Sequence, residues 1–192
     1  MCRLERGDPL SAPNARARTS TGLRNSEDKA VGAAEAAAAD RGGVGVNGER
    51  DLRLRESLHD TCLLCGSKNP AGLQLEFEAG EDGAVLAQFL CHSRFEGYKG
   101  FLHGGVAAAL LDSAMTNCLF ARGIAALTAG LNVTYKKPVR CGRPAQVRAC
   151  LVKSYPPLHE LKAQLSQDGE ILVTAEAKFM ETDLIGSHAK AA

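Results

Sequence analysis

The residues from Val106 to Ala121 are mostly Ala, Leu, Met, Cys and Phe, and they follow a turn rich in glycine. At 3.6 residues per turn, these apolar side chains occupy every side of a helix rather than one stripe. A helix that is apolar all round has to be covered on all sides. The sequence therefore predicts a long central helix around which the rest of the domain is wrapped.

One carboxylate, Asp112, interrupts this apolar helix. Burying a carboxylate is costly unless the group is paired or takes part in chemistry. We therefore interpret Asp112 as a candidate catalytic residue. The alternative is a structural carboxylate that binds a backbone group.

The turn before the helix runs from Gly100 to Gly105 and contains His103 and Gly104. Two glycines at a helix start let a ligand approach the backbone N–H groups that the first turn leaves unpaired. These amides, together with the helix dipole, can stabilise negative charge that develops on an oxygen. Gly104 is the candidate donor and Gly105 a candidate substrate contact, although the glycines could serve only the turn conformation. His103 could likewise act only as a helix cap.

Asp112 lies nine residues after His103. This spacing places the two side chains on opposite sides of a helix and about 13 Å apart along its axis. They are therefore not expected to be partners within one chain. If both serve one site, that site is most simply built from two copies of the chain.

Composition excludes several classes of function. The 192 residues suggest one domain with an extension, and 23 Lys and Arg against 22 Asp and Glu point to neither nucleic acid nor a membrane surface. Seven cysteines at irregular spacings indicate reduced thiols in a cytoplasmic protein. No apolar run approaches the roughly 20 residues of a membrane span, and the N-terminus has no signal-peptide core.

Residues 1–58 contain no aromatic side chain and are rich in Ala, Gly and charged residues. Such a segment buries too little apolar surface to offset the entropy of ordering it. We predict a disordered extension over 1–58, a folded domain over 59–183 and a flexible tail over 184–192. Two alternatives stay open for the extension. Its arginines fit an organelle transit peptide, although its acidic residues do not, and a start codon assigned too far upstream would look the same.

Alternating apolar residues predict strands on both sides of the helix. Before it, a hairpin turns at Asp82-Gly83; the strands expected are 73–79, 85–89, 128–139, 145–153, 158–165 and 171–179. Two strands, one long helix and four further strands indicate an α+β fold in which a curved antiparallel sheet wraps around one central helix. A second copy would plausibly extend such a sheet.

Residues 62–181 resemble hotdog-fold acyl-CoA thioesterases of the phenylacetate-pathway (PaaI-like) type. The motifs that carry the resemblance are Cys62-Leu63-Leu64-Cys65-Gly66, Asn69-Pro70, Gly72-Leu73, the run from Gly97 to Gly105, Leu111-Asp112, Thr128-Ala129, Asn132, Tyr135-Lys136-Lys137-Pro138-Val139 and Asp168-Gly169. A lone His-Gly-Gly would be a weak signal. Combined with the later Asp and the strand ending in Tyr-Lys-Lys-Pro, it is specific for the fold.

The resemblance implies a role for each site residue. The amide of Gly104 polarises the thioester carbonyl, and Asp112 of the other subunit acts as nucleophile or as base towards water. His103 shapes the turn and orients the thioester. Thr128, otherwise a common strand residue, holds the water or the acid. Several members that act on aromatic acyl groups carry Asn or Gln in the slot of Gly97, beside Glu96.

A basic run follows the strand that contains Thr128; it consists of Lys136, Lys137, Arg140 and Arg143. Such a run is a plausible anchor for the phosphates of coenzyme A, and its alternative is a solvated strand edge. These four residues are the candidate substrate-binding cations.

Cys62 and Cys65 have the spacing of metal ligands, but the sequence has no second Cys-x-x-Cys. Cys91-His92 is the only nearby supplement that we identify, so we expect no metal. The histidines other than His103 show no recognisable constellation; they are His59, His92, His159 and His188.

These observations lead to a hydrolase of acyl-CoA thioesters that needs no cofactor. It would form homodimers with composite sites, with pairing of dimers into tetramers as a further possibility. The competing hypothesis is a non-catalytic acyl-CoA sensor, which would not require a buried carboxylate beside the thioester. An acyl-CoA hydratase is less favoured, because no acid–base Asp/His pair in a hydration motif is visible.

Overall fold

The computed structural model describes residues 48–80 and 82–182. Most of the extension predicted over 1–58 and all of the tail predicted over 184–192 lie outside these residues, so their disorder stays a prediction. No helix in the described ranges is both long enough and apolar enough to cross a membrane.

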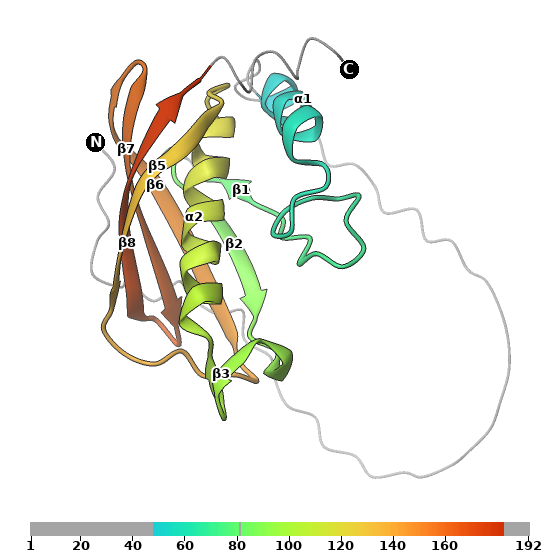
Figure 1. Ribbon diagram of the computed structural model, residues 1–192, viewed down its shortest axis with the longest axis vertical. Helices are drawn as coiled ribbons and strands as arrows, with labels where there is room; N and C mark the ends of the chain where they lie inside the picture. Colours follow the sequence, from blue (N-terminus) through green and yellow to red (C-terminus); the bar gives the residue numbers. More distant parts are fainter. Residues whose placement is uncertain (1–47, 81, 183–192) are drawn as a thin grey trace, which may run out of the picture. The chain divides into compact units, whose positions relative to one another are not determined.

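An antiparallel sheet of six strands forms the body of the domain (Figure 1). Its strands are β1 (Glu78–Ala79), β2 (Val85–Leu90), β5 (Ala126–Tyr135), β6 (Pro144–Tyr155), β7 (Leu158–Gln167) and β8 (Glu170–Glu181). They pair in the order β1-β2-β6-β7-β8-β5. A short ribbon of β3 (Glu96–Tyr98) and β4 (Phe101–Leu102) follows the 3-10 helix η1 (Ser93–Phe95) and leads into the central helix.

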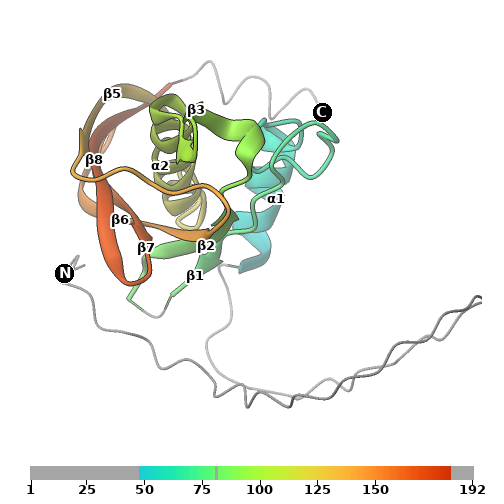
Figure 2. The ribbon, with the colours of Figure 1, turned by 90° about the horizontal axis from the view of Figure 1, so that it is seen from below.

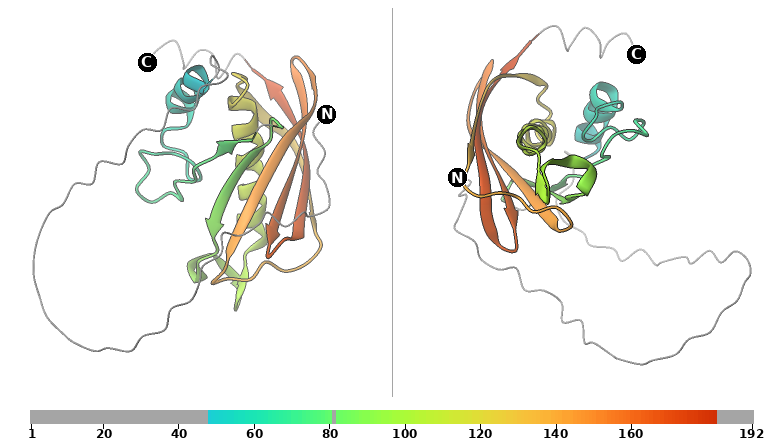
Figure 3. Two further views of the ribbon diagram at one scale, coloured as in Figure 1. Left: turned by 180° about the vertical axis from the view of Figure 1, so that it is seen from behind. Right: turned by 60° about the horizontal axis from the view of Figure 1, so that its bottom comes forward.

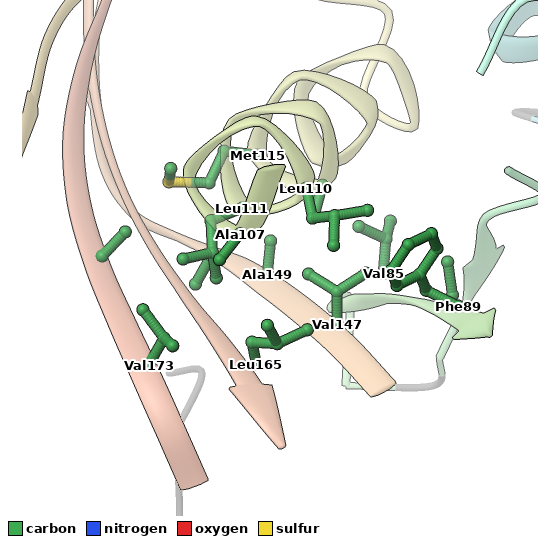
Figure 4. Packing of buried hydrophobic residues seen from close by; sticks show 14 of the residues in the cluster. Val85, Phe89, Ala107, Leu110, Leu111, Met115, Val147, Ala149, Leu165 and Val173 are labelled. Carbon is green, nitrogen blue, oxygen red and sulfur yellow. The ribbon is translucent and has the colours of Figure 1, made fainter. Parts of the chain in front are cut away.

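The central helix α2 (Gly104–Phe120) lies along the concave face of this sheet (Figure 2). Leu110 and Leu111 are fully buried, and they point towards Val147 of β6 and Leu165 of β7 (Figure 4). Alternate residues of β7 are buried against the helix, as the period of two in the sequence requires. The predicted α+β fold with a curved antiparallel sheet around one long helix is therefore confirmed.

The first predicted strand is much shorter than its alternating sequence suggests. Only Glu78–Ala79 pairs with β2, whereas the prediction began at Leu73. The amides of Leu73 and Leu75 instead bond to the carbonyls of Leu63 and Leu64, each at 2.8 Å. Gln74 between them has a φ of 48°, outside the β region. These residues therefore pair with the preceding loop rather than with the sheet.

Strand β5 ends at Tyr135, although the prediction carried it to Val139. The amides of Lys136 and Lys137 both bond to the carbonyl of Leu172, at 2.9 and 3.1 Å, so the regular ladder stops there. Pro138 then has no N–H to donate. The segment after Tyr135 therefore leaves the sheet.

A second helix, α1 (Gly48–His59), was not predicted, and it begins ahead of the domain boundary placed at residue 58. Arg55 on this helix donates to the carbonyl of Cys65 at 2.8 Å and to that of Leu75 at 3.4 Å. Leu54 and Leu58, one turn apart, are half-buried. These two leucines are the sequence signal for a packed helix, and the many charged residues around them obscured it. Helix α1 and the loop after it lie on the side of α2 away from β7 and β8 (Figure 3).

The strand β5 is an open edge of the sheet. In the described part of the chain it pairs only with β8, and nearly all of its residues are exposed. Leu127, Leu131 and Tyr135 are 51%, 38% and 53% exposed. A long edge strand with exposed apolar side chains is a template for pairing with another chain.

Candidate active site

His103 caps the N-terminus of α2 and occupies most of its first-turn donors. Its Nδ1 accepts the N–H of Gly105 at 2.9 Å, and its carbonyl accepts the amides of Val106 and Ala107 at 3.0 and 3.1 Å. Among the residues that the structure describes, none accepts the N–H of Gly104. This amide is therefore available to an external acceptor, at the positive end of the helix dipole.

Two glycines leave the space that the His103 ring fills. A Cβ on Gly105 would lie 3.1 Å from Nδ1 of His103, and a Cβ on Gly97 would lie 3.1 Å from its Cδ2. Both contacts are tighter than side chains usually allow. The glycine at position 97 is thus explained by the packing of His103 against the β3–β4 ribbon.

Tyr135, which the sequence analysis did not select, holds the other side of this turn. Its hydroxyl donates to the carbonyl of Gly104 at 2.8 Å, and a Cβ on Gly104 would lie 3.5 Å from its ring. Its place in the Tyr-Lys-Lys-Pro motif was the available signal. Tyr135 and Gly104 line a hollow of about 230 Å³ together with Leu102, Ala107, Lys136, Lys137, Pro138, Val139 and Val173.

Only two of the four candidate cations reach this hollow. Lys136 and Lys137 line it, whereas Arg140 and Arg143 do not. Lys137 forms an ion pair with Glu170, and Arg143 forms one with Asp168 at 2.8 Å. Within the described ranges Lys136 has no ion pair, so its charge is the one most available to a ligand beside Gly104.

Asp112 and Thr128 form a second part of the candidate site. Thr128 Oγ1 donates to Asp112 Oδ1 at 2.7 Å. The carboxylate is half-buried. The register of β5 against β8 shifts between Thr128 and Gly130, and such a bulge changes the direction of neighbouring side chains. The structure therefore brings together these two residues, which the sequence analysis placed in one site.

The two parts of the site are separate within one chain. Gly104 and Asp112 are eight residues apart on one continuous helix, which corresponds to about 12 Å along its axis. A reacting group bound to the Gly104 amide is thus too far from Asp112 of the same chain for direct attack. The separation along the helix axis that the sequence predicted is therefore present in the observed helix.

The structure places a different histidine beside Cys62 and Cys65 than the sequence analysis considered. The ligand atoms of His59, Cys62 and Cys65 all lie within 4.8 Å of one another. His92 instead caps η1, where its Nδ1 accepts the N–H of Arg94 at 3.0 Å. The sequence-based choice of Cys91-His92 as the further candidate metal ligands beside Cys62 and Cys65 was therefore wrong. The equal three-residue spacing from His59 to Cys62 to Cys65 was the missed signal.

Of the other histidines, His159 is fully buried on β7. Its ring nitrogens lie 3.0 Å from Ser154 Oγ and 2.8 Å from Glu181 Oε1. Strand β8 separates it from Thr128, because both residues pair with Phe179. His188 lies outside the described residues.

Known proteins resemble this chain in the segment that carries the candidate site. Residues 99–154, which include the glycine turn, α2 and β5, match the Thioesterase superfamily. The acyl-coenzyme A thioesterase THEM4 of Mus musculus is 46% identical over 44 residues, which cover 23% of this chain and 19% of that protein. A phenylacetic acid degradation-related protein from Ralstonia eutropha is 26% identical with a TM-score of 0.52, over 56% of this chain and 85% of that one. The chain has the hotdog fold, and its residues 99–154 match the Thioesterase superfamily.

Hotdog structures of lower identity show the same fold. A protein of Streptococcus mutans bound to acetyl CoA has a TM-score of 0.53 at 19% identity, and the match covers 56% of this chain and 88% of that one. The curated mouse relative is matched over only about a fifth of its length. The resemblance to PaaI-like thioesterases is thereby confirmed for the fold and for the superfamily match over residues 99–154.

Proposed function

We propose that this protein hydrolyses acyl-CoA thioesters to the free acid and coenzyme A. The observation that carries the proposal is the hydrogen bond from Thr128 to Asp112 at 2.7 Å. It orients a half-buried carboxylate on the same helix whose N-terminus presents the Gly104 amide. The superfamily match and the acyl-CoA thioesterase relative support this class of substrate.

The reaction uses the two parts of the site in distinct roles. The thioester carbonyl oxygen accepts the N–H of Gly104, which stabilises the negative charge that forms as the carbonyl is attacked. Asp112 either attacks the carbonyl carbon, to form a mixed anhydride that water hydrolyses once the thiol has left, or removes a proton from a water that attacks the carbonyl. The C–S bond then breaks, and the coenzyme A sulfur leaves as a thiolate that takes up a proton. The net reaction consumes one water and yields a carboxylic acid and a thiol.

Thr128 and His103 act as positioning residues in this scheme. The Thr128 hydroxyl engages one carboxylate oxygen of Asp112 and leaves the other for the reaction. The His103 cap engages the Gly105 amide and keeps the Gly104 amide directed outwards. Gly105 allows the close approach of the ring, and the substrate contacts the same turn.

The active unit in this proposal is a homodimer. Two β5 edges that pair with one another would continue the sheet across both copies and cover the exposed Leu127 and Leu131. Such pairing would bring Asp112 of one copy towards Gly104 of the other. It accounts for a carboxylate and an amide that one helix holds about 12 Å apart. Pairing of dimers into tetramers is the further possibility.

Lys136 is the cation that we assign to the phosphates of coenzyme A. It lines the hollow beside Gly104, and within the described ranges it has no ion pair. The acetyl CoA held by the Streptococcus mutans neighbour supports a ligand of this kind. Lys137, Arg140 and Arg143 would contribute more weakly. The cytoplasmic location stays a prediction.

A panel of acyl-CoA substrates with a thiol-release readout tests the proposal. We expect turnover of at least one acyl-CoA by the wild-type protein, and turnover lower by at least about 100-fold by a folded Asp112→Asn variant. Acyl-CoA that binds without release of thiol would instead support the sensor. Addition of water across an enoyl-CoA double bond, with the thioester intact, would support the hydratase.

A further inference from the structure

Three metal-ligating side chains meet outside the candidate active site, at the end of α1 and in the loop after it. They are His59, Cys62 and Cys65, whose ligand atoms lie within 4.8 Å of one another. We propose that these residues bind one zinc-type divalent ion, which fixes α1 and its loop to the central helix. The proposal is independent of the thioesterase chemistry.

The distance between the donor atoms of His59 and Cys65 fits a bound zinc ion without any rearrangement. His59 Nδ1 and Cys65 Sγ are 3.7 Å apart. Bond lengths of about 2.3 Å for Zn–S and about 2.0–2.1 Å for Zn–N, at a tetrahedral angle, give an N···S separation of about 3.6 Å. The two donor atoms are therefore already placed as neighbours in a tetrahedral site.

A tight turn brings the second thiol to the same place. The amide of Cys62 donates to the carbonyl of His59 at 3.1 Å, and the amide of Gly66 donates to the carbonyl of Cys62 at 3.0 Å. A Cβ on Gly66 would lie 2.3 Å from the Cys62 nitrogen, so only glycine fits at this position. The backbone conformation of this turn thus places the side chains of His59, Cys62 and Cys65 close together.

Both sulfurs also accept hydrogen bonds, as metal-bound thiolates commonly do. The amide of Leu64 lies 3.4 Å from Cys62 Sγ. Asn117 Nδ2 lies 3.5 Å from Cys65 Sγ, and it also donates to the carbonyl of Ser113 at 2.8 Å. Since Asn117 belongs to α2, the site connects the loop to the core.

The donor set indicates the class of ion. Two thiolates and an imidazole select zinc or a similar ion over magnesium and calcium, which take oxygen ligands. Two thiolates also neutralise a divalent cation, so the occupied site carries no net charge into the partly buried loop. Three protein ligands leave a fourth position for water. The site is not the thioester site, because Asn117 and Asp112 project about 140° apart around α2.

Metal analysis of the full chain, purified under reducing conditions and then incubated with excess Zn²⁺ and desalted, tests the proposal. We expect about one zinc per chain, and a Co²⁺-loaded sample should show a thiolate-to-cobalt charge-transfer absorption. Cys62→Ser and His59→Gln should each weaken Zn²⁺ binding by at least about 100-fold in competition with a chelator. His92→Gln is the matched control and should bind zinc like the wild type.

Thiol alkylation read by mass spectrometry gives a second readout that does not depend on folding of the variants. Zn²⁺ should protect the half-buried Cys62 of the wild-type protein, and a chelator should restore its reactivity, whereas Cys65 is shielded by burial in both states. Cys91, which is fully buried, should stay unreactive in both states. Only trace zinc in the wild type, unchanged zinc in Cys62→Ser, or a Cys62–Cys65 disulfide that persists under reduction would each overturn the proposal.

Discussion

Thr128 at the start of β5 donates a hydrogen bond to Asp112 in the middle of α2, with the two oxygens 2.7 Å apart. The contact joins the edge strand of the sheet to the central helix at the one acidic residue of that helix. It orients the carboxylate beside the exposed edge strand β5. The reactivity of Asp112 and the assembly of the protein are therefore expected to depend on the same strand.

Replacing Asp112 by Asn should lower turnover of an acyl-CoA by at least about 100-fold, because the amide can neither attack nor accept a proton. The Asn side chain can still accept from Thr128, so the melting temperature should stay close to that of the wild type. Thr128→Val should cause a smaller loss in kcat, and Thr128→Ser should restore most of it. Near-normal turnover by folded Asp112→Asn would show that the carboxylate is structural.

Replacing Gly104 by Pro should remove the proposed carbonyl donor while preserving the helix. Gly104 is the first helical residue, where Pro is well tolerated, and His103 before it has a ψ of 133°, which suits a residue preceding Pro. We expect kcat to fall by about 100-fold or more.

Gly104→Ala is the matched control for this variant. Its Cβ would lie 3.5 Å from the Tyr135 ring, an ordinary contact, and its N–H is retained. The Ala variant should keep most of the activity. Equal activity of the Pro and Ala variants would exclude the Gly104 amide as the donor.

Removal of residues 1–47 should change neither the melting temperature nor the activity on a short acyl-CoA. Removal of residues 1–57 should lower the free energy of unfolding by about 1–3 kcal/mol, because it deletes the bonds from Arg55 to the carbonyls of Cys65 and Leu75. Arg55→Ala in the protein lacking 1–47 should reproduce much of this loss. Urea unfolding of the three proteins measures it, and an unchanged stability without 1–57 would support the boundary at residue 58.

The stability of the protein should fall at alkaline pH through Cys91. Burial raises the pKa of this thiol from 9.0 to about 12, and the neighbouring Cys141 contributes in the same direction. Above pH 9 the unfolded chain therefore loses the Cys91 proton before the folded chain does, so rising pH favours unfolding. The expected slope is roughly 1.4 kcal/mol per pH unit between the two pKa values.

Comparison of the wild type with Cys91→Ala isolates this effect from the other groups that titrate in the same range. The variant starts from a lower stability because it leaves a small cavity. Its free energy of unfolding should then decline less steeply between pH 9 and 11. Parallel declines for the two proteins would contradict a buried, protonated Cys91.

The sequence predicted the central helix and the strands after it because their apolar periods are long and regular. It missed α1, in which Leu54 and Leu58 are surrounded by charged residues. It also extended the first strand through Leu73, because alternation alone does not reveal that the Leu73 and Leu75 amides bond to a preceding loop.

For the candidate site, spacing along the chain was a good guide to residues that cannot meet within one copy. It was a poorer guide to residues that do meet. His103 and Asp112 were correctly separated by helical geometry. The contact of Tyr135 with the Gly104 carbonyl depends on how the end of β5 packs against the turn, and the approach of His59 to the two cysteines depends on the path of a loop. Neither follows from periodicity.

Mixing Asp112→Asn chains with Gly104→Pro chains tests the composite site most directly. Each variant alone should be nearly inactive, and mass spectrometry of differently tagged chains must first show that subunits exchange. A heterodimer would contain one site with both the intact Gly104 amide and the intact Asp112, so the mixture should recover up to about a quarter of the wild-type activity. No activity above that of the separate variants after full exchange, or full turnover by a protein that is monomeric at the assay concentration, would contradict a site shared between two copies.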